Sequence, residues 1–157
     1  MAILNILKDT DPTLRKTSRE GGEITPRILT RLDDMKDTMH AANGCGLAAV
    51  QVGILRRIVV IETEESGYIE LINPKIVAYS GRQQEAEGCL SVPGRWGITD
   101  RPMHVTVKAL NRKGEEVTYT GKDLLARAFC HELDHLDGKL FTDHAIRMLS
   151  RDEIDMD

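Results

Sequence analysis

Two histidines four residues apart, in the sequence HELDH at residues 131–135, constrain this chain more than any other feature. Residues at this spacing lie on one face of an α-helix, so His131 and His135 can bind the same metal ion. Glu132 is turned away from that face, but its carboxylate can reach a water molecule bound to the metal. The pattern predicts a helix that carries a metal site and a carboxylate for proton transfer.

The helix that carries HELDH is expected to run from about residue 121 to residue 136 and to stop before Gly138. At about 100° per residue, Leu124 and Ala128 share one stripe with the two histidines. A nearly opposite stripe is also apolar and consists of Phe129, Leu133 and Leu136. A helix with apolar side chains on both faces is a buried, central helix. The metal is therefore expected inside a cleft that has an apolar wall.

Cys130 is adjacent to the first histidine, but its direction excludes it as a third ligand. It lies about 100° from His131 and about 140° from His135 around the helix, so the three side chains cannot converge. Cys130 is expected to be a buried packing residue. The third ligand must come from another segment, where Cys45, Cys89 and His104 are candidates. His104 lies in a strand pattern that favours a surface or cross-strand position, and spacing does not decide between Cys45 and Cys89. The other two histidines are expected at the surface: His40 and His144.

Short runs rich in β-branched residues occupy the middle of the chain, separated by Asn-Pro, Ser-Gly and Lys-Gly. They predict mostly antiparallel strands at residues 57–62, 68–73, 75–80, 104–110 and 115–120. Before them, Thr25-Pro26 and helical apolar spacing predict an amphipathic helix at residues 26–42. The fold class is therefore α+β, with mostly antiparallel β-sheets packed around the central helix that bears HExxH.

The bulk properties of the chain limit its setting and its partners. Its 157 residues suit a single domain spanning residues 1–157, with the last ten or so forming a frayed acidic tail. The net charge of −4 argues against nucleic acid as the main partner, and no direct nucleic-acid site is evident. No secretory signal and no membrane span are recognisable. Three cysteines without signs of export predict a reduced, cytoplasmic location.

Three separated motifs resemble, in order, the signatures of the peptide deformylases: GCGLAAVQVG (44–53), EGCLSVP (87–93) and HELDHLDG (131–138). The likeness extends over nearly all of residues 1–143 and includes DPTLRK and LINP. It implies a compact α+β hydrolase that removes the formyl group from the N-terminal formyl-methionine of nascent polypeptides. It also implies one divalent metal ion per chain, Fe(II) in the cell, which Zn, Ni or Co can replace.

The resemblance also assigns roles to individual residues. The implied metal ligands are Cys89, His131 and His135. Glu132 is the implied general acid/base, acting on a metal-bound water that attacks the formyl carbon. Gln51 and the backbone N–H of Leu90 are implied to stabilise the negative charge that develops on oxygen. Contacts with substrate are implied for Gly44, Cys45, Gly46, Glu87, Leu124, Arg127, Ala128 and Arg95.

The sequence departs from the family pattern at a few positions. Cys130 stands where glutamine is frequent, and Val50 replaces a proline or threonine. Arg95 directly precedes Trp96, whereas the family commonly has its arginine one place later; Arg95 is still expected to reach the substrate backbone. We expect Asp134 and Arg101 to form a partly buried pair that orients the helix.

The C-terminal sequence RDEIDMD differs most from the family, because some bacterial members continue in a long basic helix that binds the ribosome. An acidic end is unsuited to contact ribosomal RNA, so only transient proximity to the ribosome is expected, or binding through another surface. Two rival interpretations remain: a metallopeptidase that cuts internal peptide bonds, and a non-catalytic metal-binding relative. The presence of both Glu132 and Gln51 argues against the latter.

Overall fold

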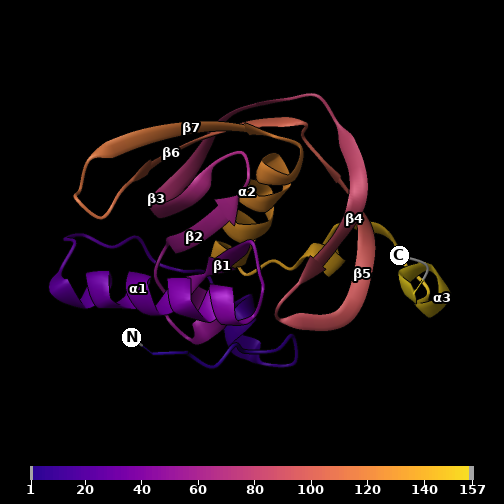
Figure 1. The fold of residues 1–157 in the computed structure, drawn as a ribbon, viewed down its shortest axis with the longest axis horizontal. Helices are drawn as coiled ribbons and strands as arrows, with labels where there is room; N and C mark the ends of the chain where they lie inside the picture. The colour runs from indigo at the N-terminus through magenta and orange to yellow at the C-terminus, as the bar shows by residue number, and fades with distance from the viewer. Residues whose placement is uncertain (1, 156–157) are drawn as a thin grey trace.

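The computed structural model describes residues 2–155, in which antiparallel strands form two sheets with a helix between them (Figure 1). The larger sheet has the strand order β1 (Gly46–Ala48), β2 (Ile58–Thr63), β3 (Gly67–Ser80), β6 (His104–Leu110) and β7 (Glu116–Lys122). The smaller sheet contains β4 (Gln83–Cys89), β5 (Val92–Arg101) and β8 (Ala145–Met148). The predicted α+β class with antiparallel sheets is confirmed.

Helix α1 (Pro26–Ala41) begins as the sequence predicts. The Thr25 side chain accepts a hydrogen bond of 3.3 Å from the backbone N–H of Ile28, and Pro26 occupies the first helical position, where no N–H is needed. On the apolar side of the helix, Leu32, Met35 and Met39 are fully buried. These side chains pack against one face of the larger sheet.

Helix α2 (Asp123–Leu136) packs against the opposite face of that sheet and carries the HELDH sequence. Strand β2 shows how both faces are covered, because successive side chains of a strand point to opposite sides. Ile58 and Val60 belong to the cluster beneath α1, whereas Val59 and Ile61 belong to the cluster that contains α2. The part of the larger sheet around β2 is therefore buried on both faces, and the prediction that α2 is central and buried is confirmed.

The observed strands differ from the predicted ones in number and length. Strand β3 is continuous across the two runs predicted at residues 68–73 and 75–80, with an irregularity at Asn73, whose φ is +52°. Four short or polar strands were not predicted: β1, β4, β5 and β8. Strand β4, with the sequence QQEAEGC, has almost no β-branched or aromatic residues, and β5 contains a proline and two glycines.

The C-terminal residues also differ from the expected frayed tail. Strand β8 pairs with β5, and a short helix, α3 (Arg151–Asp155), follows it. Residues 156–157 of the predicted tail lie outside the described residues. Short 3-10 helices complete the fold: η1 (Pro12–Arg15), η2 (Ala49–Val52) and η3 (Phe141–Asp143). Within residues 2–155, no helix has both the length and the apolar character that crossing a membrane requires.

Gly138 follows helix α2 in a conformation that only glycine adopts without strain. Its φ is +76°, and a Cβ there would lie 2.4 Å from the backbone oxygen of Arg15. We expect Gly138→Ala to lower the free energy of unfolding by at least about 1–3 kcal/mol, because strained φ and a backbone clash combine. Urea denaturation monitored by circular dichroism measures this change.

Two glycines provide matched controls for this prediction. Gly53 has a φ of +83° but open space around it, so Gly53→Ala isolates the conformational cost. Gly22 has open space and no positive φ, so Gly22→Ala should leave stability nearly unchanged. Equal urea midpoints for the Gly138 and Gly22 variants would contradict the proposed close contact.

Candidate metal centre

Three potential metal ligands from two elements meet at one point. Cys89 ends strand β4, while His131 and His135 lie one turn apart on α2. The Cys89 Sγ is 3.3 Å from Nε2 of His135, which is 3.2 Å from Nε2 of His131. All three ligand atoms lie within 4.8 Å of one another. Metal–ligand bonds of about 2.0–2.3 Å in tetrahedral geometry separate ligand atoms by roughly 3.3–3.6 Å, so a single ion fits this arrangement.

The hydrogen bonding of His131 also suits a metal. The Nδ1 of His131 lies 2.5 Å from Oε2 of Glu87, a carboxylate that can only accept, so Nδ1 donates and Nε2 faces the other ligands. Burial and the charge of His131 lower the pKa of His135 well below its usual value, which keeps His135 neutral as ligation requires. Burial lowers the pKa of His131, but Glu132, Cys89 and Glu87 together raise it above its usual value. A metal that binds His131 must therefore displace a proton from its ring.

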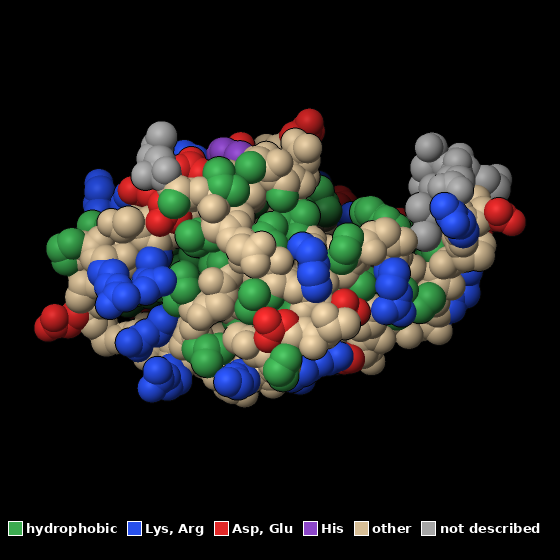
Figure 2. Space-filling model, turned by 90° about the horizontal axis from the view of Figure 1, so that it is seen from below, with side chains coloured by type: hydrophobic (Ala, Val, Ile, Leu, Met, Phe, Trp, Pro, Cys, Tyr) green, Lys and Arg blue, Asp and Glu red, His purple; other side chains and the backbone are tan. Residues whose placement is uncertain are grey.

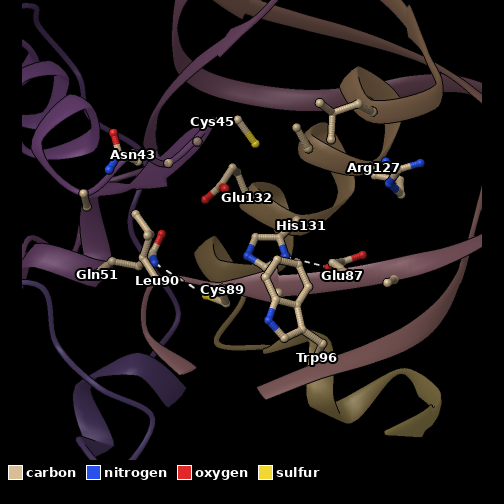
Figure 3. Close-up of a pocket in the computed structure, with 17 residues that line it drawn as sticks. Asn43, Cys45, Gln51, Glu87, Cys89, Leu90, Trp96, Arg127, His131 and Glu132 are labelled. Carbon is tan, nitrogen blue, oxygen red and sulfur yellow. Dashed lines mark hydrogen bonds and ion pairs between the residues drawn. The ribbon is translucent and has the colours of Figure 1, made fainter. Parts of the chain in front are cut away.

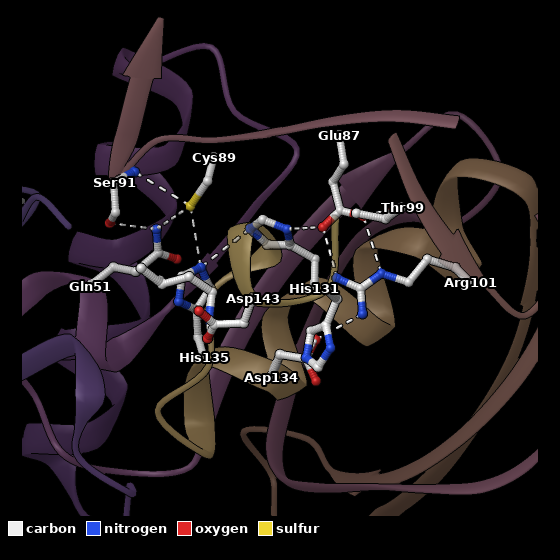
Figure 4. Close-up of polar contacts among 12 residues, drawn as sticks. Gln51, Glu87, Cys89, Ser91, Thr99, Arg101, His131, Asp134, His135 and Asp143 are labelled. Carbon is white, nitrogen blue, oxygen red and sulfur yellow. Dashed lines mark hydrogen bonds and ion pairs between the residues drawn. The ribbon is translucent and has the colours of Figure 1, made fainter. Parts of the chain in front are cut away.

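Glu87 is the centre of a buried ionic network behind His131 (Figure 4). Arg101 donates to both oxygens of Glu87 at 3.1 and 2.9 Å, and Thr99 donates to Oε1 at 2.8 Å. The third guanidinium nitrogen of Arg101 binds Asp134 of α2 at 2.8 Å, so the predicted partly buried pair is present. Burial would raise the pKa of Glu87, but the bonds from His131 and Arg101 lower it to about 2. The carboxylate is therefore charged and fixes the His131 ring.

Gln51 belongs to η2, and its side chain lies near the sulfur of Cys89. Its Oε1 accepts a hydrogen bond of 2.9 Å from the N–H of Ala48, which fixes the orientation of the amide. Its Nε2 consequently points to Ser91 Oγ at 3.1 Å and toward Cys89 Sγ at 3.7 Å. The side chain is buried, yet it borders the cavity in front of the ligands. Gln51 thus presents a fixed N–H donor beside the candidate metal position.

Glu132 has a buried carboxyl group with an unused oxygen. Among the described residues, no group forms a hydrogen bond with its Oε1. Burial raises the pKa of Glu132 to about 7, although the neighbouring His131 acts in the opposite direction. A Cβ at Gly46 would lie only 2.5 Å from Oε2, so the carboxyl group occupies the space that a side chain at position 46 would fill. Buried, unpartnered carboxyl groups of this kind are typical of functional sites.

A cavity of about 450 Å³ opens in front of these groups (Figure 3). Seven of the eight residues that were predicted to contact substrate line it: Gly44, Cys45, Gly46, Glu87, Leu124, Arg127 and Ala128. Leu90, Gln51 and Glu132 also border it. The guanidinium of Arg127 is held by Gln83 at 2.6 Å, so its stem faces the cavity. The cavity therefore joins an apolar wall to the three candidate ligands.

The eighth residue, Arg95, lies outside the cavity lining, and its predicted contact with the substrate backbone stays a prediction. Arg95 is exposed, lies 3.8 Å from Asp9, and does not line the cavity, whereas Trp96 does. Successive residues of β5 point to opposite sides, so the one-residue offset noted in the sequence exchanges arginine for tryptophan. The indole lies directly over Gly88, where a Cβ would come within 2.8 Å of the ring. The sequence also gave no signal for Asn43, which borders the same cavity.

The remaining cysteine and histidine predictions agree with the structure. Cys130 is buried in the core between α2 and the larger sheet, and burial raises its thiol pKa to about 11. Cys45 lines the cavity and is exposed as a residue, but burial of its thiol, followed by the charge of Glu132, raises the thiol pKa. The other histidines are exposed: His40, His104 and His144.

Comparisons with known proteins agree with this geometry. A family model described as polypeptide deformylase matches residues 3–151. The peptide deformylase of Acetivibrio thermocellus is 56% identical over 99% of this chain and 91% of that protein, and that of Alkaliphilus metalliredigens is 55% identical over 94% and 99%. A crystal structure of a peptide deformylase from Legionella pneumophila has a TM-score of 0.88 and 41% identity, covering 99% of this chain and 90% of that one. One from Ehrlichia chaffeensis, in complex with actinonin, has a TM-score of 0.89 and 39% identity, covering 99% and 94%. The chain therefore belongs to the polypeptide deformylase family.

Proposed function

We propose that this protein removes the formyl group from the N-terminal formyl-methionine of nascent polypeptides and releases formate. The observation that carries the proposal is the buried, unpartnered Glu132 beside three converging ligand atoms, at the wall of a largely apolar cavity. Family membership makes deformylation the reaction, and the site supplies each group that amide hydrolysis needs.

We assign the metal to Cys89, His131 and His135. Two imidazoles and one thiolate leave a fourth position open, which is typical of catalytic rather than structural sites. When bound, the metal would act as a Lewis acid that activates water and polarises the formyl oxygen. Glu87 and Arg101 hold the His131 ring in the orientation that this ligand set requires.

Glu132 is the general acid/base in this proposal. Its free Oε1 accepts a proton from the attacking water, and the same oxygen then donates a proton to the departing amine. The Gln51 amide and the backbone N–H of Leu90 donate to the oxygen on which negative charge develops. Removing one such donor typically raises the barrier by about 3 kcal/mol.

The substrate is proposed to bind through both its backbone and its first side chain. Strand β1 is an edge of the larger sheet, so the Gly44–Gly46 segment can pair with an extended peptide. The methionine side chain lies against Leu124, Ala128 and Trp96, which are among the apolar residues of the cavity lining. An extended chain bound this way places its N-terminal formyl group toward the ligands.

Formate release from formyl-Met-Ala tests the proposed reaction directly. The purified protein should release formate and methionyl-alanine in equal amounts. A metallopeptidase would instead produce new amines from an internally cleavable peptide without formate, and that result would exclude deformylation as the activity. A non-catalytic relative would produce neither.

The Glu132→Gln substitution tests the acid/base role within that assay. We expect kcat to fall by at least several hundred-fold, because proton transfer by a positioned side chain contributes about 10²–10⁴. Bound metal, measured by elemental analysis, should remain at the wild-type level, because Glu132 is not a proposed ligand. Glu85→Gln, an exposed position on β4, is the matched control and should retain full activity. An unchanged rate in Glu132→Gln would refute the assigned mechanism.

The Glu87→Gln substitution tests the orienting role of the network. A glutamine keeps the shape of the side chain but loses the charge that pairs with Arg101 and accepts from His131. We expect the affinity for metal to fall by roughly 10–100-fold, as is usual when a partner of a ligating histidine is lost. Competition with a chromogenic chelator measures this affinity, with Glu85→Gln again as the control. Wild-type affinity in Glu87→Gln would contradict the role of the network.

We further propose Fe(II) as the native metal, with Zn, Ni or Co able to replace it. A thiolate with two imidazoles suits Fe(II) and Zn alike, so the family resemblance decides for iron. Protein purified without oxygen should contain iron, and its activity should decay in air as the metal or the Cys89 thiolate oxidises. Elemental analysis and timed formate assays measure both. Air-stable activity with zinc in anaerobically purified protein would overturn this assignment.

The proposed substrate also suggests where the protein acts. Nascent formylated chains emerge from ribosomes in the cytoplasm, so we propose a cytoplasmic location with transient proximity to the ribosome. The acidic sequence at the C-terminus remains unsuited to contact with RNA phosphates. We therefore propose weak ribosome binding, or binding through another surface.

A further inference from the structure

A second cavity, of about 550 Å³, lies far from the metal centre and is lined by arginines. It is found at the N-terminal end of α1, whereas the substrate cavity is lined by Ala42 and Asn43 just beyond the other end of this helix. A 16-residue helix is about 24 Å long, so the two cavities are separate sites. Four arginines define this second cavity, which we name the arginine groove: Arg19, Arg27, Arg31 and Arg56.

The fold brings these four arginines together from three segments. Arg19 and Arg56 form an isolated parallel β-bridge, with Arg19 N–H donating to Leu55 O at 3.1 Å and Arg57 N–H donating to Arg19 O at 3.0 Å. Arg27 and Arg31 are four residues apart on α1, so they share one helical face. Lys and Arg side chains gather on this side of the molecule, where α1 begins (Figure 2). The cluster is thus set by backbone pairing and helical register.

No internal charge balances the arginine groove. Among the described residues, none of its four arginines has a carboxylate within 4.0 Å, and Glu23 is the only acidic residue in the lining. The first turn of α1 contains no acidic residue, although acidic residues stabilise that end of a helix and basic ones oppose it. By contrast, the structural arginines Arg57 and Arg101 are paired with Asp137 and Glu87. The groove therefore concentrates positive charge at a cost to stability.

The shape of the groove favours an extended anion. Its volume is within the range that holds drug-sized ligands, so it exceeds the space that a single phosphate needs. The lining of the groove includes Gly21, Gly22 and Gly53. A Cβ at any of these positions would meet no atom within 4 Å, so the groove has open space above them. Guanidinium groups bind phosphate oxygens through two parallel hydrogen bonds. Several arginines around this open space suit a nucleic-acid backbone, which carries successive phosphates.

We propose that the arginine groove binds the phosphodiester backbone of RNA and so brings the substrate cavity close to nascent chains. This inference rests on the proposed function for its choice of RNA, because nascent chains emerge beside ribosomal RNA. The net charge of −4 does not indicate such a site, since an average over the chain conceals a local cluster. Binding is electrostatic and independent of nucleotide sequence.

Fluorescence anisotropy with a short, labelled, mixed-sequence single-stranded RNA and the full chain tests this proposal. Four phosphate contacts predict a slope of about −3 for log K against log salt concentration, or roughly 50-fold weaker binding between 50 and 200 mM salt. Arg27→Gln/Arg31→Gln should remove about half of this slope and weaken binding at least roughly tenfold at 0.1 M salt. Lys113→Gln/Lys122→Gln removes the same charge from exposed positions on the β6–β7 side and should leave affinity within about twofold.

Two further measurements separate recognition from other roles of these arginines. Glutamine and arginine have similar helix propensities, so Arg27→Gln/Arg31→Gln should keep or slightly raise the free energy of unfolding. A clear loss of stability would show that the arginines are structural and overturn the proposal. Formate release from formyl-Met-Ala should be unchanged in both double variants, so RNA binding and catalysis are judged independently.

Three outcomes would count against RNA as the ligand. Equal loss of RNA binding in the arginine and lysine double variants would show that the groove is not the binding site. Displacement of RNA by inorganic tripolyphosphate at equal phosphate concentration would identify a site for free polyphosphate instead. No detectable binding of RNA at 50 mM salt would exclude the site altogether, whether or not the protein releases formate.

Discussion

The contact between Glu87 and His131 is the interaction on which the rest of the site depends. It joins strand β4 to α2, and Arg101 and Asp134 extend it to β5 and back to the helix. Buried charges are tolerated only when they are paired, and loss of one partner typically costs about 3–5 kcal/mol. The same strand carries Cys89 two residues later, so the position of the proposed third ligand and the orientation of His131 are fixed together. The smaller sheet thus contacts the helix through the Glu87 network and through Gln83, which bonds to Asp123 and Arg127.

Helix α2 packs in the core and also carries residues of the candidate site, and these two roles explain several features of its sequence. Its apolar residues pack on the larger sheet, while Glu132 faces strand β1 across a gap that only Gly46 leaves open. The result is a carboxyl group with a raised pKa and no hydrogen-bond partner for its Oε1. Such a group lowers the stability of the fold, and groups of this kind are found mainly where they serve chemistry. The sequence therefore conflicts with simple packing rules at the residue to which we assign proton transfer.

The sequence predicts the features that depend on local periodicity and leaves out those that depend on tertiary contacts. Helical spacing was sufficient for α1, for the buried position of α2 and for the exclusion of Cys130. Strands β4 and β5 have a weak intrinsic preference for β-structure and are stabilised by pairing with each other and by the Glu87 network. No local sequence pattern therefore predicted them. Likewise, spacing could not choose Cys89 over Cys45; only the family resemblance did. Trp96 was missed because a strand's alternation turns a one-residue offset into a change of face.

Charge distribution follows the same distinction between local and collective properties. Arginines that join elements are paired with carboxylates, as Arg112 is with Glu70 and Asp33 between the larger sheet and α1. Within residues 2–155, the four arginines of the groove have no carboxylate within 4.0 Å, although 25 acidic residues outnumber 21 basic ones in the chain. The proposed external partner accounts for this lack of pairing at a concave site. An external phosphate would remove the repulsion between Arg27 and Arg31 and the unfavourable interaction with the α1 dipole, so binding and local stability would be coupled.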